Sequence, residues 1–279
     1  MAGSPSSTSP APRAVLLFDI DGVIRDVGGS YRRAIVETVH HYSGRRPEPA
    51  AIDALKAEGC WNNDWEASLE LLRRQGCGQP DQAALPAFEA LVEVFNGFYF
   101  GGDPDGDPAA WQGFIGDEPL LVQPTFFTAL SAAGVAWGFV SGAEPPSARF
   151  VLAARLGLRR PPLIAMGDAP DKPDPTGFLR LAGQLLGGEQ AHSQVPVAYL
   201  GDTVADVITV QRARERQPQQ RFLSLAVAPP HLHGPAAQKQ RSRYEEQLRA
   251  AGADAILAST GDALTALEQA LSAPSPPAP

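Results

Sequence analysis

The 279-residue sequence contains only two cysteines, and no apolar run in it approaches the roughly 18 residues of a membrane-spanning helix. Cys60 and Cys77 form no C-x-x-C pair, so we expect ordinary thiols in a reducing compartment. Basic residues are outnumbered: 23 Lys and Arg against 31 Asp and Glu give a formal net charge of −8. Such a chain lacks the broad basic surface of nucleic-acid-binding proteins. We therefore expect a cytoplasmic protein that binds neither nucleic acid nor membrane.

The two ends of the sequence lack the apolar residues that packing requires. Residues 1–12 and 273–279 are rich in proline, serine and alanine, and we expect both segments to be disordered tails. A processed organelle-targeting segment is the alternative for the first. The rest of the chain has an ordinary globular composition, so its function has to be sought in motifs.

From Val135 onward, short apolar runs alternate with longer helical stretches, which is typical of βα units around a parallel sheet. We expect strands at 15–18, 135–140, 163–166, 197–200, 222–227 and 255–257. We expect helices at 125–133, 146–156, 175–186, 203–215, 235–251 and 262–271. The pattern predicts an α/β fold with a Rossmann-like, doubly wound parallel sheet as its core, formed by residues 13–27 and 119–272.

The segment 28–118 has helical periodicity but no convincing strand alternation. The helical periods lie at 31–42, 50–57, 65–74 and 85–99. Glycine- and proline-rich stretches at 28–30 and 101–108 are plausible hinges or linkers. We predict an all-helical domain inserted into the core.

The most informative local feature is a strand-like apolar run that ends in two carboxylates, Asp19 and Asp21. In doubly wound sheets the carboxyl ends of strands form the ligand crevice, so these side chains are placed for chemistry. On an extended strand they point to the same side, and a divalent cation with oxygen ligands would relieve their repulsion. For this pair alone, a solvated turn is the alternative.

A second acidic pair follows the apolar run at 197–200, where Gly201-Asp202 opens a predicted helix that carries Asp206. The four-residue spacing puts Asp206 one helical turn further on, so both carboxylates can face the same cavity. Taken alone, Asp202 could instead be a helix N-cap.

Two smaller motifs follow two further candidate strands. The hydroxyl of Ser141 and the backbone N–H groups of Ser141-Gly142 can hold phosphoryl oxygens, and Lys172 is a point charge suited to phosphate. Each signal is weak alone, because Ser-Gly is a common turn and Lys-Pro can be a surface loop.

The order of the four motifs, Asp-x-Asp, Ser, Lys-Pro and Gly-Asp-x-x-x-Asp, resembles the haloacid dehalogenase-like superfamily of hydrolases from about Arg13 to Leu271. The resemblance implies that Asp19 is a nucleophile that forms an aspartyl-phosphate and that Asp21 is the general acid and base. The resemblance further implies a preference for phosphate esters, because the family's members that cleave carbon–halogen or carbon–phosphorus bonds lack an acid at the position of Asp21.

The resemblance also implies a Mg²⁺ site and a phosphate cradle. The ion would be held by the Asp19 carboxylate, the Asp21 backbone carbonyl and Asp202, with Asp206 either a ligand or a partner of one. Ser141 and Gly142 would bind the transferring phosphoryl group, and Lys172 would neutralise Asp19 and the developing charge.

The helical insert resembles the cap of subfamily IA, which includes phosphoglycolate phosphatases and β-phosphoglucomutase. A closing cap excludes water and contacts the rest of the substrate. The candidate substrate contacts in it are Arg32, Trp61, Asn62 and Asn63, and packing within the cap is the alternative role for its aromatic residues.

The implied function is a Mg²⁺-dependent phosphatase for a small phosphorylated metabolite. A phosphomutase uses the same four motifs, and a non-catalytic phosphometabolite-binding protein is a further alternative, against which the presence of both Asp19 and Asp21 counts. The motifs leave the substrate and the oligomeric state open.

Overall fold

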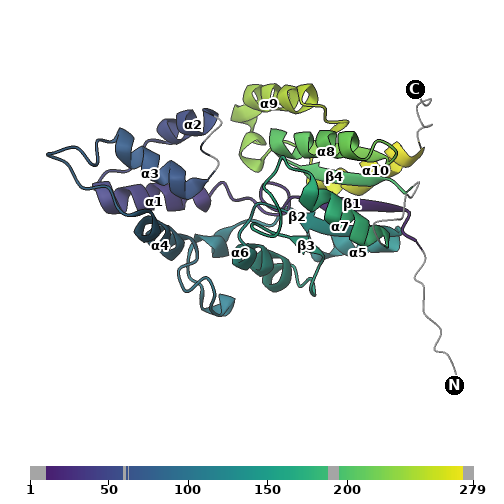
Figure 1. Cartoon of the computed structure of the whole chain (residues 1–279), viewed down its shortest axis with the longest axis horizontal. Coiled ribbons are helices and arrows are strands. Elements are labelled where there is room, and N and C mark those ends of the chain that lie inside the picture. The colour runs from purple at the N-terminus through teal and green to yellow at the C-terminus, as the bar shows by residue number, and fades with distance from the viewer. Residues whose placement is uncertain (1–10, 59–60, 62, 188–194, 273–279) are drawn as a thin grey trace, which may run out of the picture. The chain divides into compact units, whose positions relative to one another are not determined.

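The computed structural model describes residues 11–58, 61, 63–187 and 195–272. The chain divides into two compact units: a core unit, Met1–Arg25 with Leu120–Pro279, and a helical unit, Asp26–Pro119 (Figure 1). Apart from Ala11 and Pro12, the predicted tails lie outside the described residues. Within the described ranges, no helix is long and apolar enough to cross a membrane.

The core unit is built on a six-stranded sheet in which every neighbouring pair is parallel, with the order β3-β2-β1-β4-β5-β6. The strands are β1 (Ala14–Phe18), β2 (Val135–Val140), β3 (Leu163–Ile164), β4 (Val197–Gly201), β5 (Phe222–Val227) and β6 (Ala255–Leu257). Strand β3 is shorter than predicted, because the Ala165 amide turns to the Asp168 carboxylate at 2.9 Å. The predicted α/β fold with a parallel sheet is confirmed.

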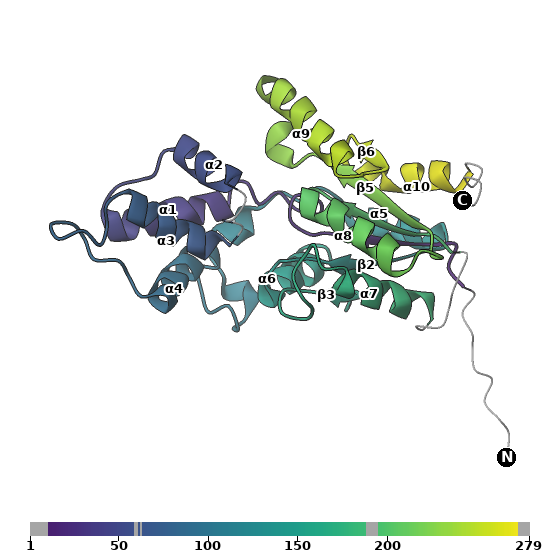
Figure 2. The ribbon, with the colours of Figure 1, turned by 45° about the horizontal axis from the view of Figure 1, so that its top comes forward.

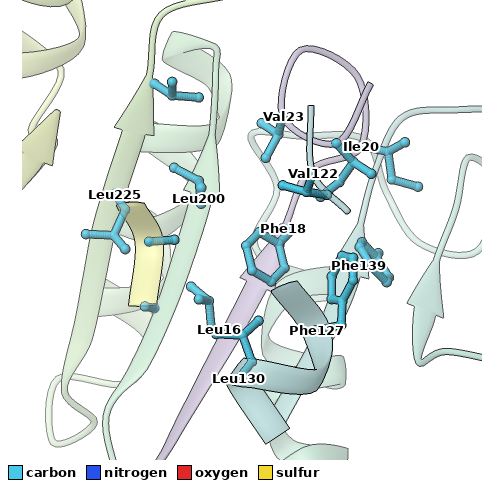
Figure 3. Packing of buried hydrophobic residues seen from close by; sticks show 14 of the residues in the cluster. Leu16, Phe18, Ile20, Val23, Val122, Phe127, Leu130, Phe139, Leu200 and Leu225 are labelled. Carbon is cyan, nitrogen blue, oxygen red and sulfur yellow. The ribbon is translucent and has the colours of Figure 1, made fainter. Parts of the chain in front are cut away.

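Strand β1 lies in the middle of the sheet, and all five of its residues are buried. Its side chains alternate between two apolar clusters, with Leu16 and Phe18 on one face and Val15 and Leu17 on the other. A strand covered on both faces needs apolar residues at every position, which explains its unbroken apolar run. Figure 3 shows Leu16 and Phe18 among residues from helix α5 and strand β2.

Helices cover both faces of the sheet (Figures 1 and 2). Helices α5 and α10 contribute to the cluster around Phe18, whereas α7 and α8 contribute to the cluster around Leu17, so the sheet is doubly wound. The helices of the core unit are α5 (Pro124–Ala132), α6 (Pro145–Arg149), α7 (Thr176–Leu186), α8 (Val204–Arg216), α9 (Gln238–Ala250) and α10 (Ala263–Ser272). The predicted helix 146–156 is α6 followed by a π-helical stretch, η3 (Phe150–Arg155). Short 3-10 turns are η4 (Pro230–Leu232), η5 (Pro235–Ala237) and η6 (Thr260–Asp262).

The helical unit packs four helices around an aromatic core, with no strand among its described residues. Its helices are α1 (Tyr31–Ser43), α2 (Pro49–Ala57), α3 (Asp64–Arg74) and α4 (Phe88–Tyr99), followed by the 3-10 turns η1 (Pro108–Ala110) and η2 (Phe114–Asp117). Tyr31 of α1 stacks on Tyr99 of α4 at a centroid distance of 4.4 Å, and Phe95 lies against both rings. Cys77 is a buried free thiol, and Cys60 lies outside the described residues.

Candidate active site

Polar residues follow β1, β2 and β4 at the carboxyl edge of the sheet, where the strand order reverses around β1. Each of two such residues extends the parallel ladder by one hydrogen bond: the Asp19 amide donates to Leu200 O, and the Ser141 amide donates to Ile164 O, both at 2.9 Å. The sheet therefore fixes the backbone of these residues at the place where ligands of doubly wound folds bind.

Four of the predicted site residues meet at this edge. Carboxylate oxygens of Asp19, Asp202 and Asp206, all buried, lie within 4.8 Å of one another. Lys172 Nζ lies 3.0 Å from Asp19 Oδ2 and 2.5 Å from Asp206 Oδ1. Residues more than 180 positions apart in the sequence thus form one charged cluster.

The protonation equilibria of the cluster are set by burial and by mutual interaction. Burial raises the pKa of Asp19 to about 6, against the lowering effect of Lys172. Burial, with Asp206 and Asp19 nearby, also holds the pKa of Asp202 well above its usual value. Burial opposes the charge of Lys172, but Asp19 and then Asp206 outweigh it and raise the pKa of Lys172 well above its usual value. Burial also opposes the charge of Asp206, but Lys172 and the hydrogen bonds from Lys172 and Thr203 lower the pKa of Asp206. One lysine faces three carboxylates, which leaves an excess of negative charge.

The hydrogen bonds of the cluster distinguish Asp202 from Asp206. Among the residues that the structure describes, none donates a hydrogen bond to the Asp202 carboxylate. Both Asp206 oxygens are engaged, Oδ1 by Lys172 and Oδ2 by the Thr203 amide at 3.0 Å and hydroxyl at 2.6 Å. A buried carboxylate without donors, in a group with excess negative charge, fits a hard divalent cation. The donor set therefore favours Asp19 and Asp202 as ligands and Asp206 as the anchor of Lys172.

Two glycines bring the backbone against these carboxylates. Gly22 has φ +75°, and a Cβ on it would lie 1.9 Å from Asp202 Oδ2. A Cβ on Gly201 would lie 2.2 Å from the Asp206 Cβ. The glycines beside both acidic motifs are thus required by the close approach of chain segments.

The other predicted core residues lie around Asp19. Asp21 raises the pKa of Asp19, and its own carboxylate accepts a hydrogen bond from Arg25 Nε at 2.7 Å. Ser141 is buried, lowers the pKa of Asp19, and accepts a hydrogen bond from the Ala143 amide at 3.2 Å. Gly142 is exposed, with open space where a side chain would be.

Three residues that contact the predicted site residues were not predicted from the sequence. Arg25 is a cation in an otherwise buried segment four residues after Asp21, a spacing that could have drawn attention to it. The Tyr199 hydroxyl, 3.2 Å from Lys172 Nζ, is the polar group of an apolar strand run. Thr203 and Asp206 have the spacing of a capping box, a pattern that is readable in the sequence.

Two of the predicted substrate contacts of the helical unit, Trp61 and Asn63, have structural partners within that unit. Trp61 Nε1 donates to Glu58 at 2.8 Å, and Asn63 Oδ1 caps α3 by accepting hydrogen bonds from the Trp65 and Glu66 amides. Arg32 is half-buried on α1, and Asn62 lies outside the described residues. Their roles in substrate binding stay predictions.

Known structures share this architecture. Phosphatase Tt82 from Thermococcus thioreducens is similar with a TM-score of 0.56 at 19% identity, covering 84% of this chain and 98% of that one. A predicted phosphoglycolate phosphatase from Haemophilus somnus 129PT has a TM-score of 0.61 at 16% identity, covering 91% and 98%. CbbY from Rhodobacter sphaeroides, solved with phosphate, has a TM-score of 0.56 at 16% identity, covering 89% and 95%. At these identities the likenesses show a shared fold.

Sequence comparison identifies the family. A protein described as imidazoleglycerol-phosphate dehydratase from Phytophthora nicotianae is 31% identical over 205 residues, which are 73% of this chain and 42% of that protein. The chain thus spans less than half the length of that relative. The family model of haloacid dehalogenase-like hydrolases matches residues 14–214, well over half of the chain. The resemblance inferred from the four motifs is confirmed, and the chain belongs to the haloacid dehalogenase-like hydrolase family.

Proposed function

We propose that this hydrolase is a Mg²⁺-dependent phosphatase that acts on a small phosphomonoester through an aspartyl-phosphate on Asp19. The observation that carries the proposal is the buried carboxylate of Asp19, 3.0 Å from Lys172 Nζ and grouped with Asp202 and Asp206. The fold shared with proteins named as phosphatases supports the same reaction class. A cytoplasmic location and a phosphorylated metabolite as partner belong to this proposal.

The geometry of Asp19 suits attack on phosphorus. Its Oδ1 accepts a hydrogen bond from the Ile20 amide at 2.8 Å, and its Oδ2 lies beside Lys172. In the first step an Asp19 oxygen forms a bond to phosphorus, the ester P–O bond breaks, and Asp21 protonates the departing oxygen. In the second step Asp21 takes a proton from water, the water oxygen bonds to phosphorus, and the bond to Asp19 breaks to release inorganic phosphate.

The surrounding residues compensate the negative charge of Asp19 and of the phosphoryl group during both steps. Lys172 compensates the charge of Asp19 and of the transferring group, and Ser141 with the adjacent Gly142 amide would hold phosphoryl oxygens. Mg²⁺, held by Asp19, the Asp21 carbonyl and Asp202, would supply the positive charge that lets an anionic nucleophile approach a dianionic phosphate. Asp206 keeps Lys172 in place through the 2.5 Å ion pair.

The decisive variant is Asp19→Asn, because an amide cannot serve as the attacking carboxylate. We expect the folded variant to lose phosphatase activity by several orders of magnitude. Phosphate release and trapping of the phospho-enzyme would be measured together. Asp262→Asn is the matched control, since Asp262 belongs to the capping box that Ser259 begins ahead of α10. Near-native turnover by Asp19→Asn would overturn the mechanism.

The substrate class is tested by a panel of phosphorylated metabolites ranked by kcat/KM. The panel should contain phosphoglycolate and imidazoleglycerol phosphate, which appear in the names of a structural neighbour and of the Phytophthora relative. Free phosphate released without a bisphosphate activator supports a phosphatase. Dependence on such an activator would instead indicate a phosphomutase, and binding without turnover would indicate a non-catalytic protein.

A further inference from the structure

Arg25 is a completely buried arginine in the core unit, with 0% of its surface exposed. Its Nε donates to Asp21 Oδ1 at 2.7 Å, and its Nη2 donates to Ser147 Oγ at 2.7 Å. Ser147 is also fully buried and belongs to α6, the helix that starts shortly after Ser141. Burial of a guanidinium is costly unless it is paired and hydrogen-bonded. The guanidinium of Arg25 therefore binds neighbouring side chains and has no contact with solvent.

The backbone around Arg25 forms a tight loop that brings its side chain back onto Asp21. The Gly22 amide donates to Arg25 O at 2.9 Å, and the Arg25 amide donates to Ile20 O at 3.2 Å. Arg25 also forms an isolated antiparallel bridge with Leu120, beside a hydrogen bond from the Leu121 amide to Ile24 O. These bonds fix the backbone of the loop, and the ion pair with Arg25 then restricts the two side-chain torsions of Asp21.

We propose that Arg25 is a positioning residue that holds the Asp21 carboxylate in a single orientation for proton transfer to the leaving oxygen. The inference rests on the proposed phosphatase function, in which Asp21 is the general acid. A charge-assisted hydrogen bond to Oδ1 is short and directional, so it presents Oδ2 to the reacting group in a defined direction. Ser147 of α6 accepts a hydrogen bond from Nη2 of Arg25 and so fixes the orientation of the guanidinium in turn.

The role makes a specific kinetic prediction. General acid catalysis matters most for leaving groups that depart poorly without a proton, and it matters little for good ones such as p-nitrophenolate. If the Asp21 carboxyl is misplaced, kcat/KM should therefore depend more steeply on the pKa of the leaving group. A purely structural role would lower kcat/KM by the same factor for every substrate.

The experiment compares Arg25→Met with wild type on a series of aryl and alkyl phosphates of graded leaving-group pKa. Met keeps much of the length and apolar surface of the side chain but removes the guanidinium. We expect kcat/KM to fall about 10- to 100-fold for alkyl phosphates and less than about threefold for p-nitrophenyl phosphate, which is less than the roughly 10²–10⁴-fold of complete general acid catalysis because Asp21 itself is retained. Arg25→Lys, which keeps a positive charge and a single donor nitrogen, should recover part of the loss.

Two further variants make the result specific. Asp21→Asn should steepen the same dependence, and the double variant Arg25→Met/Asp21→Asn should be no slower than Asp21→Asn alone, because both changes disable one function. Arg221→Met is the matched control: Arg221 Nη2 donates to Ala270 O at 2.6 Å, so its loss should affect all substrates equally.

The outcomes separate this inference from the function on which it rests. The role of Arg25 alone would be overturned if Asp21→Asn steepened the dependence of kcat/KM on leaving-group pKa but Arg25→Met did not. Additive losses of kcat/KM in the double variant would have the same meaning. A flat profile for Asp21→Asn would overturn the acid role itself and this inference with it. If circular dichroism shows that Arg25→Met does not fold, Ser147→Ala decides. Ser147→Ala should lower kcat/KM for alkyl phosphates by about two- to fivefold more than for p-nitrophenyl phosphate. An equal effect on all substrates would overturn the inference.

Discussion

Gly22 meets two constraints at once: a left-handed backbone and direct contact with the Asp202 carboxylate. We expect Gly22→Ala to lose most phosphatase activity and Mg²⁺ affinity, because the added methyl group would displace Asp202. Titration calorimetry with Mg²⁺ and phosphate release would measure both. Gly167→Ala is the matched control, since Gly167 has φ +84° but open space at its Cβ position. Each variant should lose about 1–2 kcal/mol of stability from backbone strain, and equal activity in the two would contradict this account.

Glu144, which immediately precedes α6, predicts a pH effect on stability. Burial raises its pKa above the ordinary 4.5, so the folded state binds its proton more tightly than the unfolded state does. Its contribution to stability is therefore complete below pH 4.5 and is lost as pH rises through the higher folded pKa. Glu144→Gln removes this loss. The Tm of the variant minus that of wild type should increase from pH 4 to pH 8, and a pH-independent difference would be the contrary result.

The N-terminus of α8 links helix capping to the charge of the site. Thr203 and Asp206 form a reciprocal capping box, and the same Asp206 carboxylate holds Lys172. Ser259 and Asp262 form a second capping box ahead of α10, on a different strand end. The two boxes share local chemistry, but only the first is tied to Lys172.

We therefore expect Thr203→Ala and Ser259→Ala to lower the free energy of unfolding by similar amounts, about 1 kcal/mol each. Thr203→Ala should also reduce kcat, because Asp206 loses a hydrogen bond and holds Lys172 less firmly. Chemical denaturation and steady-state kinetics would test both effects. Equal kcat values in the two variants would show that the capping box does not influence the site.

The strands and most helices of the core were predictable because they depend on local periodicity. The runs at 135–140 and 222–227 are apolar and end where turns begin, and the observed strands have the predicted bounds. The convergence of Asp19 with Asp202 also followed, because carboxyl ends of parallel strands share one edge of the sheet. The difference between the hydrogen bonding of Asp202 and that of Asp206 did not, because it depends on which oxygens Thr203 and Lys172 occupy. The contact of Arg25 with Ser147 joins segments 122 residues apart and leaves no local periodicity.

The whole core unit should respond to Mg²⁺, because only the folded chain gathers Asp19 and Asp202 into one site. Ligand that binds the folded state alone stabilises it by about 2.7 kcal/mol at a concentration 100 times its Kd. We expect Tm to rise with Mg²⁺ in wild type, to be insensitive to it in Asp202→Asn, and to respond normally in Asp262→Asn. Exhaustive chelation should abolish activity. A wild-type Tm that ignores Mg²⁺, or full activity after chelation, would refute the metal assignment.

The central place of β1 in the sheet has a consequence for how the protein is made. Both neighbours of β1 come late in synthesis, β2 only after residues 19–134 and β4 later still. At about 5–20 residues per second, this strand of five apolar residues emerges on the order of ten seconds before it has a pairing partner. During that interval the five apolar residues Ala14–Phe18 have no strand partner, so we expect them to need protection from aggregation while the separate helical unit is synthesised.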